Sequence, residues 1–366
     1  MEIAGTVREV ETEPGVTLWV QDLPAHRPTP AAPVLLVNGA GSAGYGWPDA
    51  LVEVLRERHR VVRYDHRDTG RSTHAFEDRP YAVADLATDA LAVLDGCGID
   101  RAHLVGMSLG GTLVQLLALD APDRMVSATL LCTAALDTGD ADLPGPTRDV
   151  LRMWQELGDP RDEAGELAWR VEYWRRVSGG VLPFDTAEFA ARERRIMDHT
   201  GRVEPCTAHA QADLDGLDRG AELGSVTVPT LVVEAPKDPV HPPPHADHLA
   251  ARIGAAAQLV TVDGMGHALP DLLCEPIAGV LLEHAAEAEE AEADRAAQRP
   301  EADRAAQRAE ADPAAQRAEA DPAAQRAEAD PAAQRAEADP ATQRAAAHPA
   351  ASRAEALRGA GQPTQR

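Results

Sequence analysis

Aromatic residues, lysine and long apolar runs are scarce in this sequence. Aromatics make up only 3% of the 366 residues, so Leu, Val and Ala must supply most of any core. Lys237 is the only lysine, which we interpret as genomic base-composition bias. No stretch approaches the roughly 18 apolar residues that a membrane-spanning helix needs, and the N-terminus lacks the basic and apolar segments of a signal peptide. We therefore expect a cytoplasmic protein with no membrane partner.

Positive charge and paired cysteines are also missing. The formal net charge is −25, which argues against nucleic acid and anionic membranes as partners. The four cysteines form no CxxC pair and no His/Cys cluster at metal-binding spacing. We expect Cys97, Cys132 and Cys274 to be buried free thiols, and we expect no metal ion and no cofactor.

The composition changes near residue 286, which divides the chain into two regions. A nine-residue unit close to EADPAAQRA repeats after that point, and from residue 313 it carries one proline per repeat. A step of nine residues puts equivalent positions on opposite faces of a helix, so no apolar stripe forms. We predict that residues 286–366 form a disordered or transiently helical tail. A solvated passenger is the simplest interpretation, a partner-binding tether is the alternative, and the sequence names no partner for the tail.

Residues 1–285 alternate between short apolar runs and amphipathic stretches. The apolar runs predict strands at 33–39, 60–65, 102–108, 127–135, 228–235 and 256–264. Helical spacing of apolar residues predicts helices at 84–96 and 109–120. This alternation is typical of an α/β fold whose mostly parallel sheet is covered on both faces.

A long interruption at about 137–224 separates two of the predicted strands. It predicts three helices, near 147–157, 161–177 and 186–199, and it carries a large share of the aromatic residues. We interpret it as a helical cap over an active site. Trp154 and Trp174 are tentative substrate contacts, although simple packing within the cap explains each ring as well.

The segment Gly106-Met107-Ser108-Leu109-Gly110 fits the pattern G-x-S-x-G. An apolar strand is predicted before Ser108 and a helix after it, which is the setting of a nucleophile elbow. The turn is tight, so both flanking glycines must lack side chains. The helix N-terminus also favours negative charge that develops nearby. An ordinary glycine-rich turn is the alternative.

A serine nucleophile needs a general base, and His267 is the best placed of the thirteen histidines. It follows a predicted strand on the loop Gly264-Met265-Gly266-His267, and the order Ser, acid, His along the chain is the one that accompanies a nucleophile elbow. Three competitors lie in a proline-rich segment and an apparent helix instead: His241, His245 and His248.

The acid that orients His267 is expected on the loop after the preceding strand. Asp238 lies in Ala-Pro-Lys-Asp-Pro, where a loop can bring it to the histidine. Glu234 lies within the end of the strand, and Asp263 is too close along the chain to His267. We therefore favour Asp238.

An oxyanion hole needs two backbone N–H groups. We expect one from Leu109, directly after the nucleophile, and one from Ala40 in the loop after the strand at 33–39. Asn38 begins that loop and is a tentative substrate contact. The segment 65–72 has paired Asp and Arg residues and a glycine, which indicate a fixed supporting turn.

These residues resemble the α/β-hydrolase superfamily, and more narrowly the aclacinomycin methylesterase group of anthracycline biosynthesis. The similar segments are 44–49, 61–73, 92–111, 182–193 and 262–270. The resemblance covers about residues 10–285 and none of the tail. It implies an α/β-hydrolase fold and hydrolysis of a methyl ester on a polyketide-derived aromatic substrate without a cofactor. Ser108, Asp238 and His267 match the triad positions, and Ala40 and Leu109 match the oxyanion donors.

The expected function is a serine hydrolase that cleaves a carboxylic ester of a small molecule through an acyl-enzyme. Perhydrolase or haloperoxidase-like chemistry on the same constellation is the alternative. A non-catalytic ligand-binding protein is a further one, which the complete set of triad residues disfavours.

Overall fold

The computed structural model describes residues 3–137 and 143–310, with side chains as far as residue 298. The chain divides into two compact units, Met1–Ala296 and Ala297–Arg366. The first unit carries all the residues with a predicted chemical role. Among the described residues, no helix is both long enough and apolar enough to cross a bilayer.

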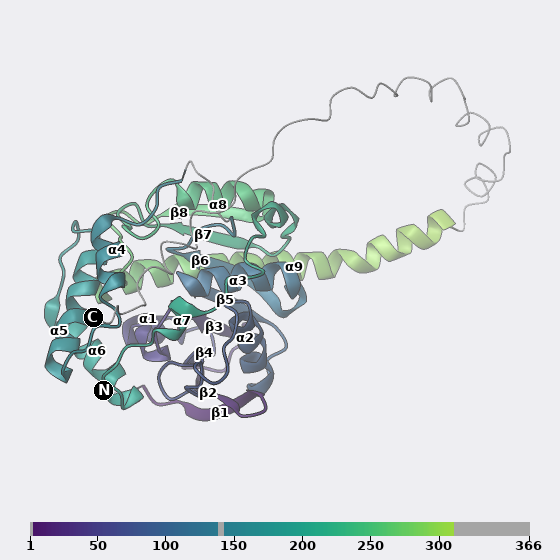
Figure 1. Ribbon diagram of the computed structural model, residues 1–366. Helices are drawn as coiled ribbons and strands as arrows, with labels where there is room; N and C mark the ends of the chain where they lie inside the picture. The colour runs from purple at the N-terminus through teal and green to yellow at the C-terminus, as the bar shows by residue number, and fades with distance from the viewer. Residues whose placement is uncertain (1–2, 138–142, 311–366) are drawn as a thin grey trace, which may run out of the picture. The chain divides into compact units, whose positions relative to one another are not determined.

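An eight-stranded sheet forms the centre of the first unit (Figure 1). Its strands, in spatial order, are β1 (Thr6–Glu13), β2 (Val16–Leu23), β4 (Val61–Tyr64), β3 (Val34–Val37), β5 (Ala102–Met107), β6 (Met125–Leu131), β7 (Thr230–Glu234) and β8 (Ala257–Thr261). All pairs from β4 to β8 are parallel, whereas β1 and β2 join antiparallel at one edge. The prediction of a mostly parallel sheet is confirmed. The charged, largely exposed strand β1 gave no apolar run by which to predict it.

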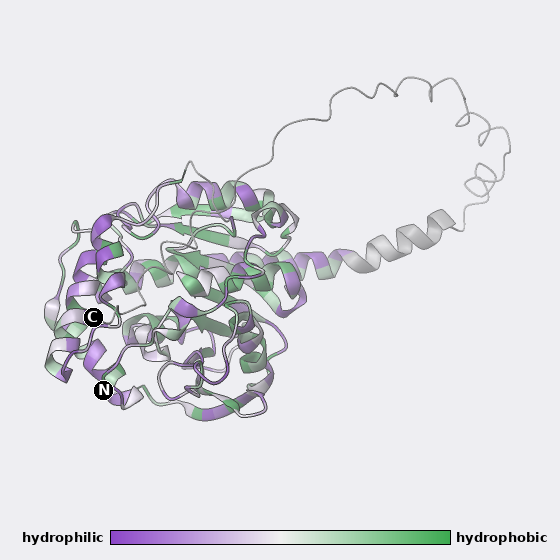
Figure 2. Cartoon of the chain, in the orientation of Figure 1, coloured by the Kyte–Doolittle hydropathy of each residue, from purple (hydrophilic) through white to green (hydrophobic). Residues whose placement is uncertain are grey.

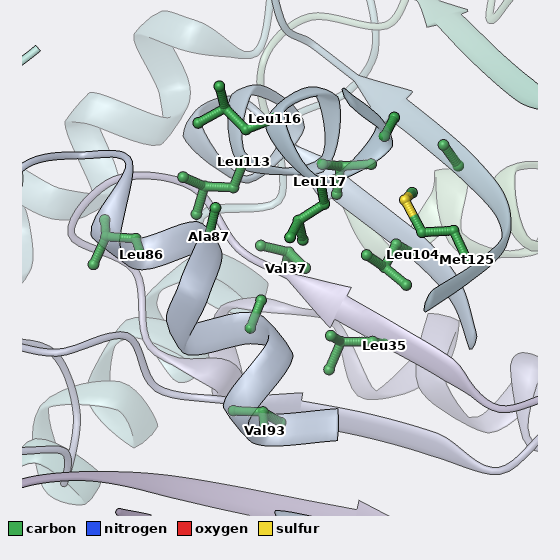
Figure 3. Packing of buried hydrophobic residues seen from close by; sticks show 14 of the residues in the cluster. Leu35, Val37, Leu86, Ala87, Val93, Leu104, Leu113, Leu116, Leu117 and Met125 are labelled. Carbon is green, nitrogen blue, oxygen red and sulfur yellow. The ribbon is translucent and has the colours of Figure 1, made fainter. Parts of the chain in front are cut away.

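Two apolar layers cover the sheet because successive residues of a strand face opposite sides. Leu35 and Val37 of β3 pack with α2 (Asp85–Gly96), α3 (Leu109–Asp120) and α8 (His245–Ile253). Figure 3 shows part of this layer, built almost entirely from aliphatic side chains. Leu36 of β3 faces the opposite layer, with α1 (Asp49–Leu55) and α9 (Cys274–Glu310).

The segment between β6 and β7 forms the predicted helical cap. Its helices are α4 (Arg148–Gln155), α5 (Glu163–Val177), α6 (Thr186–Thr200) and the short α7 (Ala208–Gln211). The side chains of Asp162 and Asp185 accept backbone N–H groups at the starts of α5 and α6. Figure 2 shows many hydrophilic residues on these helices, in contrast with the hydrophobic central strands.

The supporting turn at 65–72 contacts helix α6 of the cap. The buried Asp65 carboxylate accepts one hydrogen bond from Nε2 of His199, on α6, at 2.7 Å and one from the Arg71 N–H at 2.8 Å. Gly70 has a φ of +52°, and a Cβ there would lie 2.0 Å from a carboxylate oxygen of Asp65. The expectation of a fixed turn therefore agrees with these contacts.

Helix α9 crosses the boundary that the sequence predicts at residue 286. Ala288 is 3% exposed, Glu289 accepts the Ala32 N–H at 2.8 Å, and Glu292 pairs with Arg101. The first unit therefore extends to Ala296. Alanine and glutamate favour a helix, and Glu289 and Glu292 of this helix contact Ala32 and Arg101. The prediction of disorder for 311–366 lies outside the described residues.

Candidate active site

Ser108 lies on a sharp turn between β5, which ends at Met107, and α3, which begins at Leu109. Its φ of 55° and ψ of −120° are strained for a non-glycine residue. A Cβ on Gly106 would lie 2.3 Å from the Gly110 carbonyl oxygen, and a Cβ on Gly110 would lie 2.1 Å from the Val37 oxygen. Both glycines are therefore required by close backbone approach, as the sequence predicts for a nucleophile elbow.

His267 and Asp238 form a buried hydrogen-bonded pair. Nδ1 of His267 lies 2.8 Å from Oδ2 of Asp238, and the carboxylate can only accept, so the proton lies on Nδ1 and Nε2 is unprotonated. Oδ1 of Asp238 accepts the Val240 and His241 N–H groups at 2.7 and 3.1 Å. Burial raises the pKa of Asp238, but His267 and the amide of His241 outweigh it and hold the pKa below its ordinary value.

The end of helix α5, in the cap, holds the loop that carries His267. The His267 N–H donates to the carbonyl oxygen of Val177, the last residue of α5, at 2.7 Å. Gly266 packs against the backbone just after α5, so that a Cβ on Gly266 would lie 2.4 Å from the Ser178 carbonyl carbon. The Lys237 N–H donates to Met265 at 2.8 Å and so joins the loops that carry the acid and the base.

The loop after β3 lies close to Ser108. A Cβ on Gly39 would lie 3.3 Å from Cβ of Ser108. Ala40 follows as an exposed residue, and Leu109 opens α3, where no preceding helical carbonyl takes its N–H. The Asn38 side chain donates to Ala43 and accepts from Gly39, both at 2.8 Å. The Asn38 side chain therefore holds the loop, and its contact with a substrate stays a prediction.

Two buried histidines support this loop: His66, from the predicted supporting turn at 65–72, and His209, which the sequence did not single out. Nε2 of His66 lies 3.0 Å from the Asn38 carbonyl oxygen. Nδ1 of His209, from α7, accepts the Gly41 N–H at 2.9 Å, and its Nε2 lies 3.0 Å from the Arg67 oxygen. Burial lowers the pKa of each ring to about 4, which keeps both neutral. Their distance along the chain from residues 38–41 left no local signal.

Glu234, His245 and His248 have partners outside the Asp238–His267 pair. Glu234 accepts the Thr261 hydroxyl at 2.6 Å. The rings of His241 and His267 lie 5.7 Å apart, and burial lowers the pKa of His241 to about 3. His245 lies 2.9 Å from the Pro144 oxygen, and His248 pairs with Asp137. Among the described candidates, Asp238 is the acid that the fold brings to His267.

The two tryptophans predicted as substrate contacts, Trp154 and Trp174, differ in exposure. Trp154 is 42% exposed, and its indole N–H lies 3.4 Å from the Tyr173 hydroxyl. The Trp174 indole donates to Glu193 at 2.6 Å inside the cap. Trp174 also packs on an apolar cluster that contains Ala268, next to His267. Their contact with a substrate stays a prediction.

One group of possible metal ligands lies within this site. Ligand atoms of Cys132, Asp238 and His267 lie within 4.8 Å of one another. Burial, and then Asp238, raise the pKa of the Cys132 thiol well above its usual value, whereas a metal requires the thiolate. The Asp238–His267 hydrogen bond already explains this arrangement. Cys97, Cys132 and Cys274 are buried free thiols, as predicted, and Cys206 is half-buried.

Comparison with known proteins agrees with this geometry. Residues 32–271 match the family model of the alpha/beta hydrolase fold. The chain belongs to the α/β-hydrolase family. It is 44% identical to rhodomycin D methylesterase of Streptomyces peucetius over 292 residues, which cover 75% of this chain and 96% of that protein. With such relatives, the chain is a carboxylic ester hydrolase of this family.

More distant relatives and solved structures share the fold. A putative carbamate hydrolase of Variovorax paradoxus is 34% identical over 59% of this chain and 78% of that protein. The crystal structure of a hydrolase from Pseudomonas aeruginosa superposes with a TM-score of 0.58 at 28% identity, over 77% of this chain and 98% of that one. The coverage of the hydrolase unit is thus nearly complete.

Proposed function

We propose that the chain is a serine hydrolase that cleaves a methyl ester of a polyketide-type aromatic substrate through an acyl-enzyme. The observation that carries the proposal is that one folded unit contains both the buried Asp238–His267 pair and the strained elbow at Ser108. The identity of 44% to a rhodomycin D methylesterase supports the choice of ester.

In the proposed mechanism, Ser108 Oγ attacks the ester carbonyl and Nε2 of His267 takes the hydroxyl proton. Asp238 holds the imidazole in the tautomer with the proton on Nδ1 and stabilises the imidazolium that forms. The backbone N–H groups of Ala40 and Leu109 stabilise the oxyanion. As the bond between the carbonyl carbon and the methoxy oxygen breaks, the His267 imidazolium protonates the methoxide, which leaves as methanol. Water, activated by the same imidazole, then hydrolyses the acyl-enzyme to the carboxylic acid and free Ser108.

The cap supports a large, mostly apolar substrate. Tyr173, Trp174 and Phe184 pack on a cluster that reaches Ala268, directly after the proposed base. Exposed Trp154 adds an aromatic ring on α4. Flat aromatic faces of this kind stack with fused-ring ligands, which makes the cap the proposed determinant of specificity.

The test combines turnover with capture of the nucleophile. Wild type and Ser108→Ala are assayed on a short p-nitrophenyl ester and on an anthracycline-type methyl ester, with release of methanol measured. A fluorophosphonate probe, followed by peptide mass spectrometry, reports which residue becomes modified. Turnover that depends on Ser108, together with labelling at Ser108, is expected.

Each arm has an outcome that contradicts part of the proposal. Cleavage of the small ester alone would remove the polyketide substrate and leave the triad. Equal turnover by Ser108→Ala, or labelling at another residue, would remove the triad. Halogenation that depends on peroxide, in the absence of ester cleavage, would favour the haloperoxidase-like alternative.

A further inference from the structure

A second cluster of chemically capable side chains lies far from the candidate active site. It consists of His59 just before β4, His103 near the start of β5, and Glu289 on α9. Both histidines are 2% exposed, and their ring centroids lie 5.4 Å apart. Because β5 has six residues and Ser108 follows its far end, roughly 15–20 Å of strand separate this cluster from the nucleophile.

The three side chains present their ligand atoms to one another. Nε2 of His103 lies 3.3 Å from Oε1 of Glu289. One ligand atom from each of the three residues falls within 4.8 Å of the other two. A tetrahedral zinc ion with bonds of about 2.0 Å separates its ligand atoms by about 3.3 Å. Small side-chain movements therefore suffice to enclose an ion.

Hydrogen-bond partners outside the cluster hold both rings in place. Nδ1 of His59 lies 2.8 Å from the Ala32 carbonyl oxygen, which can only accept, so Nδ1 carries the proton and Nε2 is free to bind a metal. Nδ1 of His103 lies 2.8 Å from the Ser127 hydroxyl. The Ala32 N–H in turn donates to Glu289 at 2.8 Å. Outer contacts of this kind fix the tautomer and direction of zinc ligands.

We propose that His59, His103 and Glu289 bind one zinc ion that holds α9 against the edge of the sheet where the parallel strands begin. Two imidazoles and one carboxylate suit zinc, and water completes the coordination. The role is structural, since the ion joins a helix to two strands at the edge opposite Ser108. The ligands lie 44 and 186 residues apart along the sequence, so no spacing motif announces the site.

The test uses the full chain, stripped of metal with a chelator and titrated with zinc chloride. Calorimetry and elemental analysis are expected to give one zinc per chain, and saturation is expected to raise Tm by about 5 °C. Glu289→Gln keeps the side-chain shape and is expected to weaken zinc binding by about 100-fold or more. His284→Gln is the matched control on the same helix, because Nε2 of His284 faces the Pro229 oxygen instead.

Cobalt substitution tests the ligand set without any variant. Cobalt held by imidazoles and a carboxylate is expected to show weak visible bands only, whereas cobalt on Cys132 would add intense thiolate charge-transfer absorption. Three results would overturn the proposal: no saturable zinc binding, equal affinity in wild type and Glu289→Gln, or thiolate absorption together with inhibition of ester hydrolysis. The last result would place the ion on Cys132, Asp238 and His267.

Discussion

The Gly41 N–H donates to Nδ1 of His209 at 2.9 Å, so a cap residue fixes the loop that carries the proposed oxyanion donor Ala40. The contact joins α7 to the loop after β3 across 168 positions of sequence. Nε2 of the same ring lies 3.0 Å from the Arg67 oxygen, which holds the imidazole on both sides. The cap is therefore connected to the proposed oxyanion hole as well as to the His267 loop.

Replacement of His209 should affect the rate more than substrate binding. His209→Phe removes the acceptor for Gly41, and a mispositioned donor at Ala40 should lower kcat by about 10-fold, less than the loss of a donor itself. His209→Gln offers an amide oxygen to Gly41 and an amide N–H to Arg67, and it should retain most of the rate. Steady-state kinetics on one ester separate kcat from KM. An equal rise of KM in both variants, with kcat unchanged, would show that His209 acts on binding alone.

Acid should destabilise the fold through His66 and His209. Burial lowers both pKa values from 6.5 to about 4, so the folded chain binds fewer protons than the unfolded chain between these values. The stability these rings contribute is thus full above pH 6.5 and is lost as the pH falls toward 4, by up to about 3 kcal/mol each. Urea unfolding at intervals of pH measures the slope. His209→Gln removes one titrating group and should make the slope shallower; an unchanged slope would contradict the assignment.

The sequence predicted the features that depend on local pattern. Apolar runs gave the parallel strands, and the glycines around Ser108 gave the elbow, because backbone geometry there admits no side chain. The support from His209 and the cluster around His103 could not be predicted, because their partners meet only after the sheet and α9 have assembled. Composition marked the boundary at 286, whereas the contacts of α9 continue beyond it as far as Glu292.

Asp238→Asn should lower kcat by about 10⁴-fold while the domain stays folded. The Asp238 carboxylate accepts hydrogen bonds from Nδ1 of His267 and from two backbone N–H groups. The asparagine side chain has only one oxygen, so its NH₂ group must face one of these donors. An NH₂ group that faces His267 favours the wrong imidazole tautomer. Glu234→Gln and Asp263→Asn are the matched controls and should keep the wild-type rate. Circular dichroism confirms folding, and activity lost equally in a control would reopen the choice of acid.

Gly110→Ala should destabilise the chain and abolish activity. A Cβ there would lie 2.1 Å from the Val37 oxygen, so the elbow must move away from β3 at a cost of about 3 kcal/mol. Gly279→Ala, on the exposed side of α9 with nothing within 4 Å, should instead add about 0.5–1 kcal/mol. Thermal unfolding compares the two. A neutral Gly110→Ala would mean that the elbow is looser than its contacts indicate.

Truncation separates the tail from the end of the hydrolase unit. Removal of 297–366 leaves Glu289 and Ala288 in place and should preserve both activity and the free energy of unfolding. Removal of 286–366 deletes the hydrogen bonds of Glu289 to Ala32 and His103 and should cost about 2 kcal/mol. Both truncated proteins are unfolded in urea with a chelator present, so that bound metal does not contribute. Equal stability would show that α9 adds nothing beyond residue 285, whereas a loss confined to the shorter chain fixes the end of the folded unit near Ala296.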